Sequence, residues 1–205
     1  ENKLKSIGVC DSFNLCGALE FSEKISKTGT QPIIGTQINF RFQDYVSKLP
    51  LFAISEKGFK NLSRLSSKSF LEIKPDESPH CLFDDLLEHN NDVIVLSGGF
   101  RDFFGGLFKL NKLRQLEDLL QKINNSFKDK FYLEIQRHNE DNEKSFEDYL
   151  ITISKKLDIP LIASQEIFYI NKDMHEAHDA LICIGEKRFI SDINRLKYND
   201  QHYLK

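Results

Sequence analysis

The fold class is decided by one stretch, Ile7-Gly-Val-Cys-Asp-Ser-Phe-Asn-Leu-Cys-Gly-Ala-Leu-Glu-Phe-Ser-Glu-Lys-Ile25, which continues into Gln31-Pro-Ile-Ile-Gly-Thr-Gln-Ile-Asn-Phe40. A short apolar run meets a polar corner, and an amphipathic helix follows. Gly29 ends this helix, because glycine adopts the left-handed dihedrals that a helix stop requires. A second apolar run over 33–40 completes a strand–helix–strand unit, which favours parallel strands and a right-handed crossover. The face predicted to be apolar on this helix comprises Leu15, Ala18, Leu19, Ser22 and Ile25.

Polar side chains follow the strands of this unit. Asp11 and Ser12 come directly after the first apolar run, and Gln37 lies in the second. Sites in α/β units lie where the strands end. These three positions are therefore the first candidates for a functional site.

Strands and helices alternate along the rest of the chain, which predicts an α/β fold. No linker divides the sequence, so we expect a single domain over 1–205 with a polar, irregular tail over about 189–205. Strands are expected near 6–10, 33–40, 51–55, 92–97, 131–135 and 161–164. Helices are expected at 59–70 (with Phe59, Leu62, Leu65 and Phe70 inward), 81–89, 102–109, 112–127, 143–157 and 173–184, the last with Asp173 as N-cap and Gly185 as its stop.

Composition excludes several classes of protein. The net charge is −3 over 205 residues, and neither half is basic enough to bind nucleic acid by charge alone. The four cysteines form no C-x-x-C pair, which argues against a zinc site of paired thiolates. Cys10 and Cys183 lie in apolar runs and are interpreted as core residues, which fits a reducing cytoplasm. No apolar run approaches 18 residues, so we expect no membrane association.

Two local motifs favour structure over chemistry. Ser97-Gly98-Gly99 follows a strand but lacks the G-x-x-x-x-G-K-[ST] pattern, so a tight turn is favoured over a phosphate-binding loop. His175 and His178 are spaced i, i+3, whereas the zincin motif needs i, i+4. His178 falls on the apolar face of its helix. We therefore predict that His178 is largely buried, with its ring hydrogen-bonded and no metal nearby.

Two further polar residues, His138 and Glu166, follow strands. His138, Glu166 and Asp11 are candidates to meet at one rim of the sheet. A metal site would need more imidazole and carboxylate ligands than these. The residues at comparable positions, Ser12, Gln37 and Phe168, are poor ligands, so a polar corner without metal is favoured.

The order of the motifs resembles the polymerase-and-histidinol-phosphatase (PHP) domain family, in the form found at the start of bacterial replicative DNA polymerase III alpha subunits. The opening segment, Cys10-Asp-Ser-Phe-Asn-Leu-Cys-Gly-Ala-Leu-Glu-Phe21, is similar to T-D-H-G-N-L-x-G-A-x-E-F. The further segments that resemble the family, in chain order, are Gln31-Pro-Ile-Ile-Gly-Thr-Gln37, Lys57-Gly-Phe-Lys-Asn-Leu62, Val95-Leu-Ser-Gly-Gly99, Phe131-Tyr-Leu-Glu-Ile-Gln136 with His138, Ala163-Ser-Gln-Glu166 through Tyr169, Glu176-Ala-His-Asp179 and Asp192-Ile-Asn-Arg195.

This resemblance implies a distorted β/α barrel of about seven, mostly parallel strands. In some members it also implies a metal cluster at the strand ends with phosphoesterase activity of the proofreading type. Ser12 and Phe168 stand where the family has histidines, Gln37 stands for a glutamate and Glu166 for an aspartate. Only His138 is unchanged among the ligand positions, and the family's opening H-x-H would precede Glu1. A vestigial metal site with no bound metal and no catalytic residue is thus expected at six positions: Asp11, Ser12, Gln37, His138, Glu166 and Phe168.

Two functions remain open. The first is a non-catalytic scaffold in a longer, cytoplasmic polymerase chain. Nucleotide addition with Mg²⁺, and contact with DNA, would then take place elsewhere in that chain. The resemblance implies that such a scaffold stabilises the polymerase and docks a proofreading exonuclease. The second is an active metal-dependent phosphoesterase or 3′–5′ exonuclease of the PHP family. The flanking residues would distinguish these functions: a long continuation past Lys205 favours the scaffold, and an upstream H-x-H with a stop soon after Lys205 favours the phosphoesterase.

Overall fold

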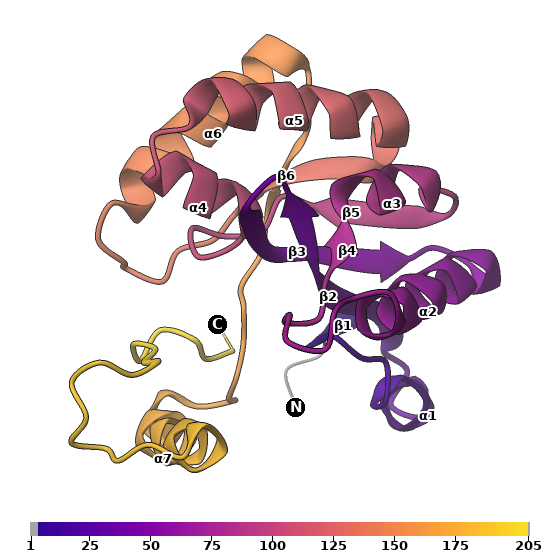
Figure 1. Ribbon diagram of the computed structural model, residues 1–205. Coiled ribbons are helices and arrows are strands. Elements are labelled where there is room, and N and C mark those ends of the chain that lie inside the picture. The colour runs from indigo at the N-terminus through magenta and orange to yellow at the C-terminus, as the bar shows by residue number, and fades with distance from the viewer. Residues whose placement is uncertain (1–3, 205) are drawn as a thin grey trace.

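The computed structural model describes residues 4–204 (Figure 1). A curled, half-barrel sheet lies against helices, as expected for an α/β chain. The strands are β1 (Ser6–Ser12), β2 (Gln31–Phe42), β3 (Tyr45–Ala53), β4 (Cys81–Leu82), β5 (Val93–Leu96), β6 (Phe131–Ile135) and β7 (Leu161–Ala163). The helices are α1 (Ala18–Ser26), α2 (Glu56–Leu71), α3 (Phe83–Glu88), α4 (Phe103–Lys109), α5 (Leu113–Phe127), α6 (Glu143–Leu157) and α7 (His175–Glu186).

The main path of the sheet runs β1-β2-β3-β5-β6-β7, and β4 pairs with β2 outside this path. Most pairs are parallel, as predicted, and all six expected strands are present. The exceptions are the two antiparallel pairs that β3 makes, with β2 and with β5. They arise because β2 and β3 form a hairpin through Gln43 and Asp44, where Gln43 adopts a φ of 55°. Strand β3 therefore begins at Tyr45, within a stretch that the sequence analysis left without a strand.

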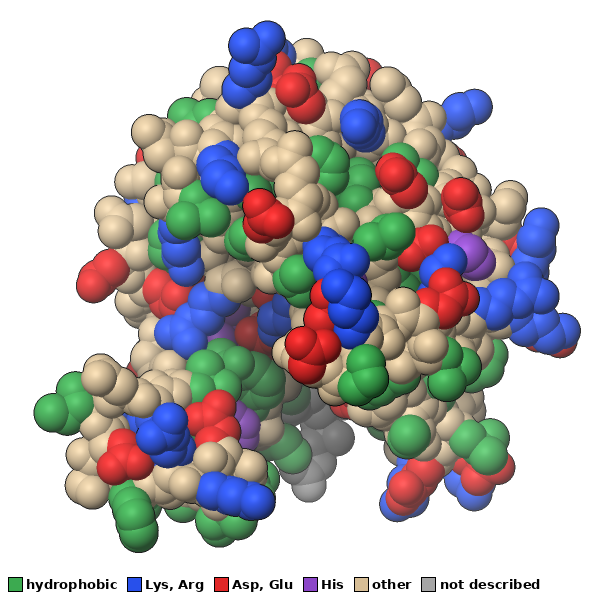
Figure 2. Space-filling view, viewed as in Figure 1, with side chains coloured by type: hydrophobic (Ala, Val, Ile, Leu, Met, Phe, Trp, Pro, Cys, Tyr) green, Lys and Arg blue, Asp and Glu red, His purple; other side chains and the backbone are tan. Residues whose placement is uncertain are grey.

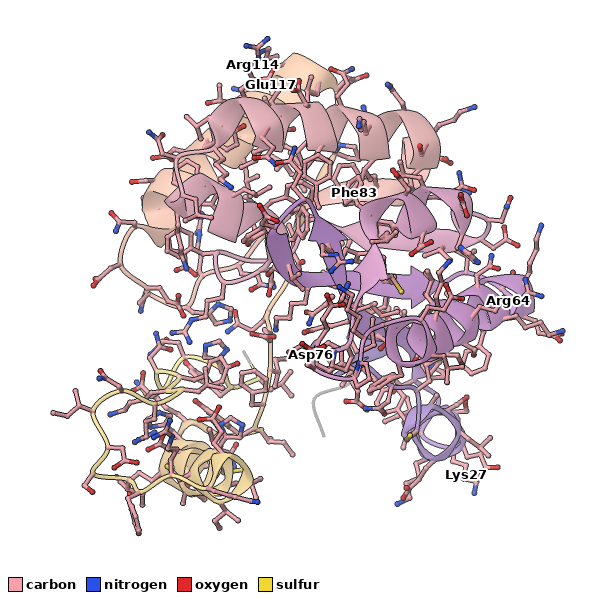
Figure 3. All side chains as sticks on the ribbon, viewed as in Figure 1. Lys27, Arg64, Asp76, Phe83, Arg114 and Glu117 are labelled. Atoms are coloured by element: carbon pink, nitrogen blue, oxygen red, sulfur yellow. The ribbon has the colours of Figure 1, made fainter. Side chains whose placement is uncertain are left out.

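Phenylalanine supplies most of the aromatic packing in the core, in a chain that lacks tryptophan. Phe103 and Phe104 open α4 and are completely buried. Phe83, at the start of α3, stacks on Phe103 with ring centroids 5.7 Å apart. Figure 3 shows Phe83 directed into the interior between α3 and α5, whereas Arg114 and Glu117 lie on the outer side of α5. Burying side chains of this size supplies most of the driving force for folding.

Helix α2 is rotated from its predicted phase. Leu62 and Leu65 are completely buried as expected, but Phe59 is 37% exposed and Phe70 is 52% exposed. Asn61 takes an inward position because its Nδ2 donates to the main-chain oxygen of Asn91 at 2.8 Å. The predicted face of α1 is also partly wrong, since Leu19 is 73% exposed.

Three predicted helix boundaries differ in the structure. The segment expected as one helix from residue 81 begins with the short strand β4, and its helix covers only Phe83–Glu88. Asp173 does not cap α7, because the chain enters that helix through a 3-10 turn over Lys172–Met174. Gly185 does not end α7, which continues to Glu186 and stops at Lys187 with a φ of 54°.

Helix α7 and the segment after it lie to one side of the sheet and the other helices (Figure 1). Arg195 ties this segment to α7 by two bonds to the carboxylate of Asp179, at 2.6 and 2.7 Å. Tyr203 returns to pair with Tyr169 in an isolated bridge. Up to residue 204, the tail has no regular helix or strand, as predicted, but it is folded back onto the protein. Within residues 4–204, no helix is both long and apolar enough to cross a membrane.

Candidate functional site

A cleft of about 500 Å³ opens where β1, β2, β3 and the segment after β7 converge. Five of the six predicted site positions line it: Asp11, Ser12, Gln37, Glu166 and Phe168. The sixth, His138, lies behind Glu166 in a separate small cavity. Most of the positions predicted from the sequence therefore line one cleft. Glu166 lines both cavities, so it lies next to His138 on one side and shares the larger cleft with Asp11 on the other.

Neutral side chains connect the first two strands to Glu166. Ser12 and Gln37 are register partners in the parallel pair β1–β2, and Ser12 Oγ lies 3.5 Å from Gln37 Oε1. Gln37 Nε2 donates to Glu166 Oε1 at 3.3 Å. Gln37 lies in the middle of β2 rather than at its end, because β2 continues to Phe42 in the hairpin.

Lys48 is at the centre of the charged part of the cleft, and sequence reasoning missed it. Its Nζ lies 2.9 Å from Glu166 Oε1 and 3.4 Å from Asp102 Oδ1. Pro50 pairs with Gln37 in the hairpin, so Lys48, two residues away, points to the same face of the sheet. Recognising the hairpin would have placed Lys48 beside Gln37.

Asp102, which was also missed, is 4% exposed and approaches from the loop before α4. Its Oδ2 accepts the N–H of Gly99 at 2.7 Å. Burial raises the pKa of Asp102 to about 7, although Lys48 opposes this shift. The loop over Ser97-Gly98-Gly99 thus presents the N–H of Gly99 to a carboxylate of its own chain, which supports the turn interpretation over phosphate binding.

Glu134, on β6, supplies a third buried carboxylate to the cleft wall. Its Oε1 accepts hydrogen bonds from Gln136 Nε2, at 2.9 Å, and from Ser164 Oγ. Its Oε2 is buried without a hydrogen-bond partner among residues 4–204. Burial raises the pKa of Glu134, so its charged form is disfavoured at this position.

His138 is held by Glu143 and by His202. The main-chain N–H of His138 donates to both carboxylate oxygens of Glu143 at 2.9 Å. Its ring stacks on that of His202 with centroids 4.0 Å apart. Both rings have a buried Nε2 without a hydrogen-bond partner within the described residues. His202 belongs to the tail, where no pattern in the sequence indicated a site residue.

Phe168 fills the space beside these histidines. Its ring stacks on His202 on one side, with centroids 5.1 Å apart, and on His178 on the other, at 5.0 Å. His178 is half-buried rather than largely buried, and its Nδ1 finds no hydrogen-bond partner among residues 4–204. The prediction for this ring was therefore wrong. The apolar face of α7 is exposed, and His178 is held by stacking instead.

The residues present do not fit a multinuclear metal cluster. In the described part of the chain, no three His, Cys, Asp or Glu side chains converge in a geometry that would hold an ion. Ser12 and Gln37 offer only neutral oxygens, Phe168 offers no ligand atom, and an ammonium group lies between two of the carboxylates. A metal cluster requires several anionic or imidazole ligands around an open position.

Comparison with known proteins places this fold in a family. Residues 1–138 match the family described as "PHP domain". The DNA polymerase III subunit alpha of Rickettsia bellii is 38% identical over 89% of this chain and 16% of that protein. The same subunit of Caulobacter vibrioides is 32% identical over the whole chain and 19% of that protein. The chain thus spans less than a fifth of the length of these relatives.

A solved structure from Bifidobacterium adolescentis, described provisionally as a metal-dependent phosphoesterase, has a similar fold. It superposes with a TM-score of 0.53 over 80% of this chain and 77% of that one, at 12% sequence identity. At this level of identity the likeness concerns the fold alone. The motifs, the half-barrel sheet and the sequence matches agree, and the chain belongs to the PHP domain family.

Proposed function

We propose that this chain is the PHP domain of a replicative DNA polymerase III alpha subunit and that it acts as a non-catalytic scaffold. One observation carries the proposal: two of the carboxylates of the cleft, Asp102 and Glu166, are paired with Lys48 where a hydrolytic site would need metal ions. A hydrolase of this type must activate water on a bound ion and leave a coordination position open for it. An ammonium group offers neither function.

The aromatic stacking supports the same proposal. Phe168 stands at a histidine position of the family motif, and its ring lies between His202 and His178. A side chain held on both faces cannot swing away to admit an ion without losing these contacts. Phe168 therefore lines this side of the cleft with a ring that offers no ligand atom.

The polymerase chain itself is the proposed principal partner. The sequence matches support this partner, because the relatives are much longer polymerase subunits. Helix α7 and the segment after it expose an apolar surface, visible as the hydrophobic side chains of the lower left lobe in Figure 2. Such a surface is what contact with more protein would bury. Its most exposed members are Leu181, Ile184, Phe189, Ile190 and Ile193.

Further roles follow from this assignment as parts of the proposal. Nucleotide addition with Mg²⁺ and binding of DNA belong to other parts of the polymerase chain. Docking of a proofreading exonuclease subunit is a second scaffold role. The protein is then cytoplasmic, like the replication machinery it serves.

The test is metal analysis after dialysis against zinc and manganese, together with an exonuclease assay on single-stranded DNA. The natural chain is used with its flanking residues intact. We expect less than one equivalent of metal at the cleft and no hydrolysis that depends on His138. The variant His138→Ala is compared with His89→Ala, a histidine that follows α3 and does not line the cleft. Two or more ions per cleft, with hydrolysis abolished only by His138→Ala, would establish the phosphoesterase instead.

A further inference from the structure

We propose that Lys48 is the built-in cation of the cleft: its ammonium group takes the place of divalent metal and holds Asp102 and Glu166 together. This inference deepens the scaffold function and rests on it. It identifies one residue whose loss should open the cleft to an ion.

The first argument is geometric. Lys48 Nζ lies 2.9 Å from Glu166 Oε1 and 3.4 Å from Asp102 Oδ1, so one ammonium contacts two carboxylates from distant parts of the chain. Asp102 Oδ1 has no hydrogen-bond partner among residues 4–204, which leaves the lysine as the group that compensates it. Glu166 Oε1 also accepts a hydrogen bond from Gln37 Nε2, so it is contacted by one neutral amide and by the ammonium of Lys48.

The second argument is electrostatic. The side chains of Asp102 and Glu166 are 6% and 15% exposed, and Glu134 stands beside them in the same cleft. Carboxylates this close repel one another and lose hydration, so a buried group of them is stabilised by a cation or by taking up a proton, and the ammonium of Lys48 provides the cation. Burial alone would lower the pKa of Lys48, but Asp102 and Glu166 raise it above its ordinary value. The lysine therefore remains charged throughout the physiological range.

The third argument concerns position. Lys48 projects from β3, whose backbone pairs with β2 on one side and β5 on the other. Its side chain is only 22% exposed and reaches the cleft floor rather than solvent. Surface lysines seldom hold one geometry, whereas a mostly buried lysine on a paired strand loses less entropy when it does so. At Lys48 the pairing partner is Asn39 of β2.

The chemistry of the two cations differs in a way that suits a scaffold. An ammonium has three N–H donors and a single charge, and it has no vacant orbital with which to polarise a phosphate oxygen or lower the pKa of water. It can neutralise the carboxylates and link β3 to the loop before α4 and the segment after β7. The link is permanent, since it does not depend on the concentration of any free ion.

The test compares Lys48→Met with the unaltered protein by thermal unfolding, with and without about 1 mM MnCl₂, and by Mn²⁺ content after gel filtration. We expect Mn²⁺ to leave the unaltered protein unchanged. In Lys48→Met, Asp102 and Glu166 lose the ammonium that lies between them, and we expect them to move together around about one Mn²⁺ per chain, with a rise in Tm of about 5 °C or more on adding Mn²⁺. Lys68→Met is the matched control, because Lys68 pairs with Asp85 at 2.8 Å outside the cleft. It should show no response to Mn²⁺.

A second variant separates ion binding from folding. If Lys48→Met does not fold without metal, Lys48→Met/Glu166→Gln removes the cation together with one carboxylate charge. This variant should fold and should show no response to Mn²⁺. The inference is overturned if Lys48→Met is folded and indifferent to Mn²⁺, or if the double variant still fails to fold. Those results leave the scaffold function standing. Stoichiometric metal in the unaltered protein would instead refute both.

Discussion

The imidazole rings of His138 and His202 stack face to face, with centroids 4.0 Å apart and 10° between their planes. His202 Nδ1 lies 3.2 Å from the main-chain oxygen of Glu166. In the neutral ring, Nδ1–H donates a hydrogen bond to this oxygen. Two charged rings at this separation would repel each other. Burial and the neighbouring His138 together lower the pKa of His202 to about 4. The pair therefore needs both rings neutral.

This stacked pair predicts a pH dependence of stability. His202 has a lower pKa in the folded protein than the ordinary value of about 6.5, so the unfolded chain binds the extra proton first. The stabilisation is complete above about pH 6.5 and is lost as the pH falls towards 4. Between about pH 7.5 and pH 5, we expect the free energy of unfolding to drop by about 2 kcal/mol from this residue. Asp102, whose pKa is raised to about 7, changes stability in the opposite direction over this range, so urea unfolding must compare the unaltered protein with a variant that lacks the His202 ring nitrogen.

The variant His202→Phe supplies the control for that measurement, because it keeps an aromatic ring in the stack and removes the titrating nitrogen. Its stability should fall less steeply over the same pH range. A slope equal to that of the unaltered protein would show that the drop arises from other groups.

A second prediction concerns the loop that carries Asp102. Gly98 adopts a φ of 77°, and a Cβ there would lie 2.6 Å from the Cβ of Asp102. Gly98→Ala should therefore lower the free energy of unfolding by about 1 kcal/mol through backbone strain. It should lower it further because the new methyl group displaces Asp102. Gly29 has a φ of 76°, and a Cβ added there would meet nothing within 4 Å, so Gly29→Ala measures the strain alone. Equal losses in Tm for the two variants would contradict the close packing at Gly98.

A third prediction tests the phase of α2. Leu65 is completely buried, whereas Leu71 in the last turn of the same helix is 80% exposed. Leu65→Ala should lower the free energy of unfolding by about 2–5 kcal/mol, because it removes buried methyl groups and leaves a cavity. Leu71→Ala, the same change in composition, should alter it by about 0.5 kcal/mol or less. Chemical denaturation gives both values, and similar costs would mean that the helix is rotated differently.

A fourth prediction concerns the attachment of the tail. The guanidinium of Arg195 is 4% exposed and forms a bidentate pair with Asp179, whose pKa it lowers through these hydrogen bonds. Arg195→Met should free the segment over 187–196 and increase its amide hydrogen exchange by about tenfold or more. Lys172→Met is the control, because Lys172 pairs with Asp200 on the exposed surface. Exchange unchanged in Arg195→Met would show that other contacts hold the tail.

The sequence by itself determined the α/β class, the six expected strands and the family. These features are local, since alternating apolar runs and amphipathic stretches record which backbone segments must be buried. It also determined which ligand types are missing, because Ser12, Gln37 and Phe168 are poor metal ligands or none, whatever surrounds them. Five of the six predicted positions then met in one cleft, as strand ends in such folds do.

Only the tertiary structure decided which groups compensate the charges of that cleft. Lys48 and Asp102 reach it from a hairpin strand and a loop, and His202 reaches the small cavity on the other side of Glu166 from the tail. No periodicity in the sequence relates these three residues to Glu166. The hairpin makes β3 run antiparallel to β2, and this pairing brings Lys48 to the same face of the sheet as Gln37. The phase of α2 and the exposure of α7 were decided in the same way. Burial is a property of what packs against a side chain, and that partner lies elsewhere in the chain.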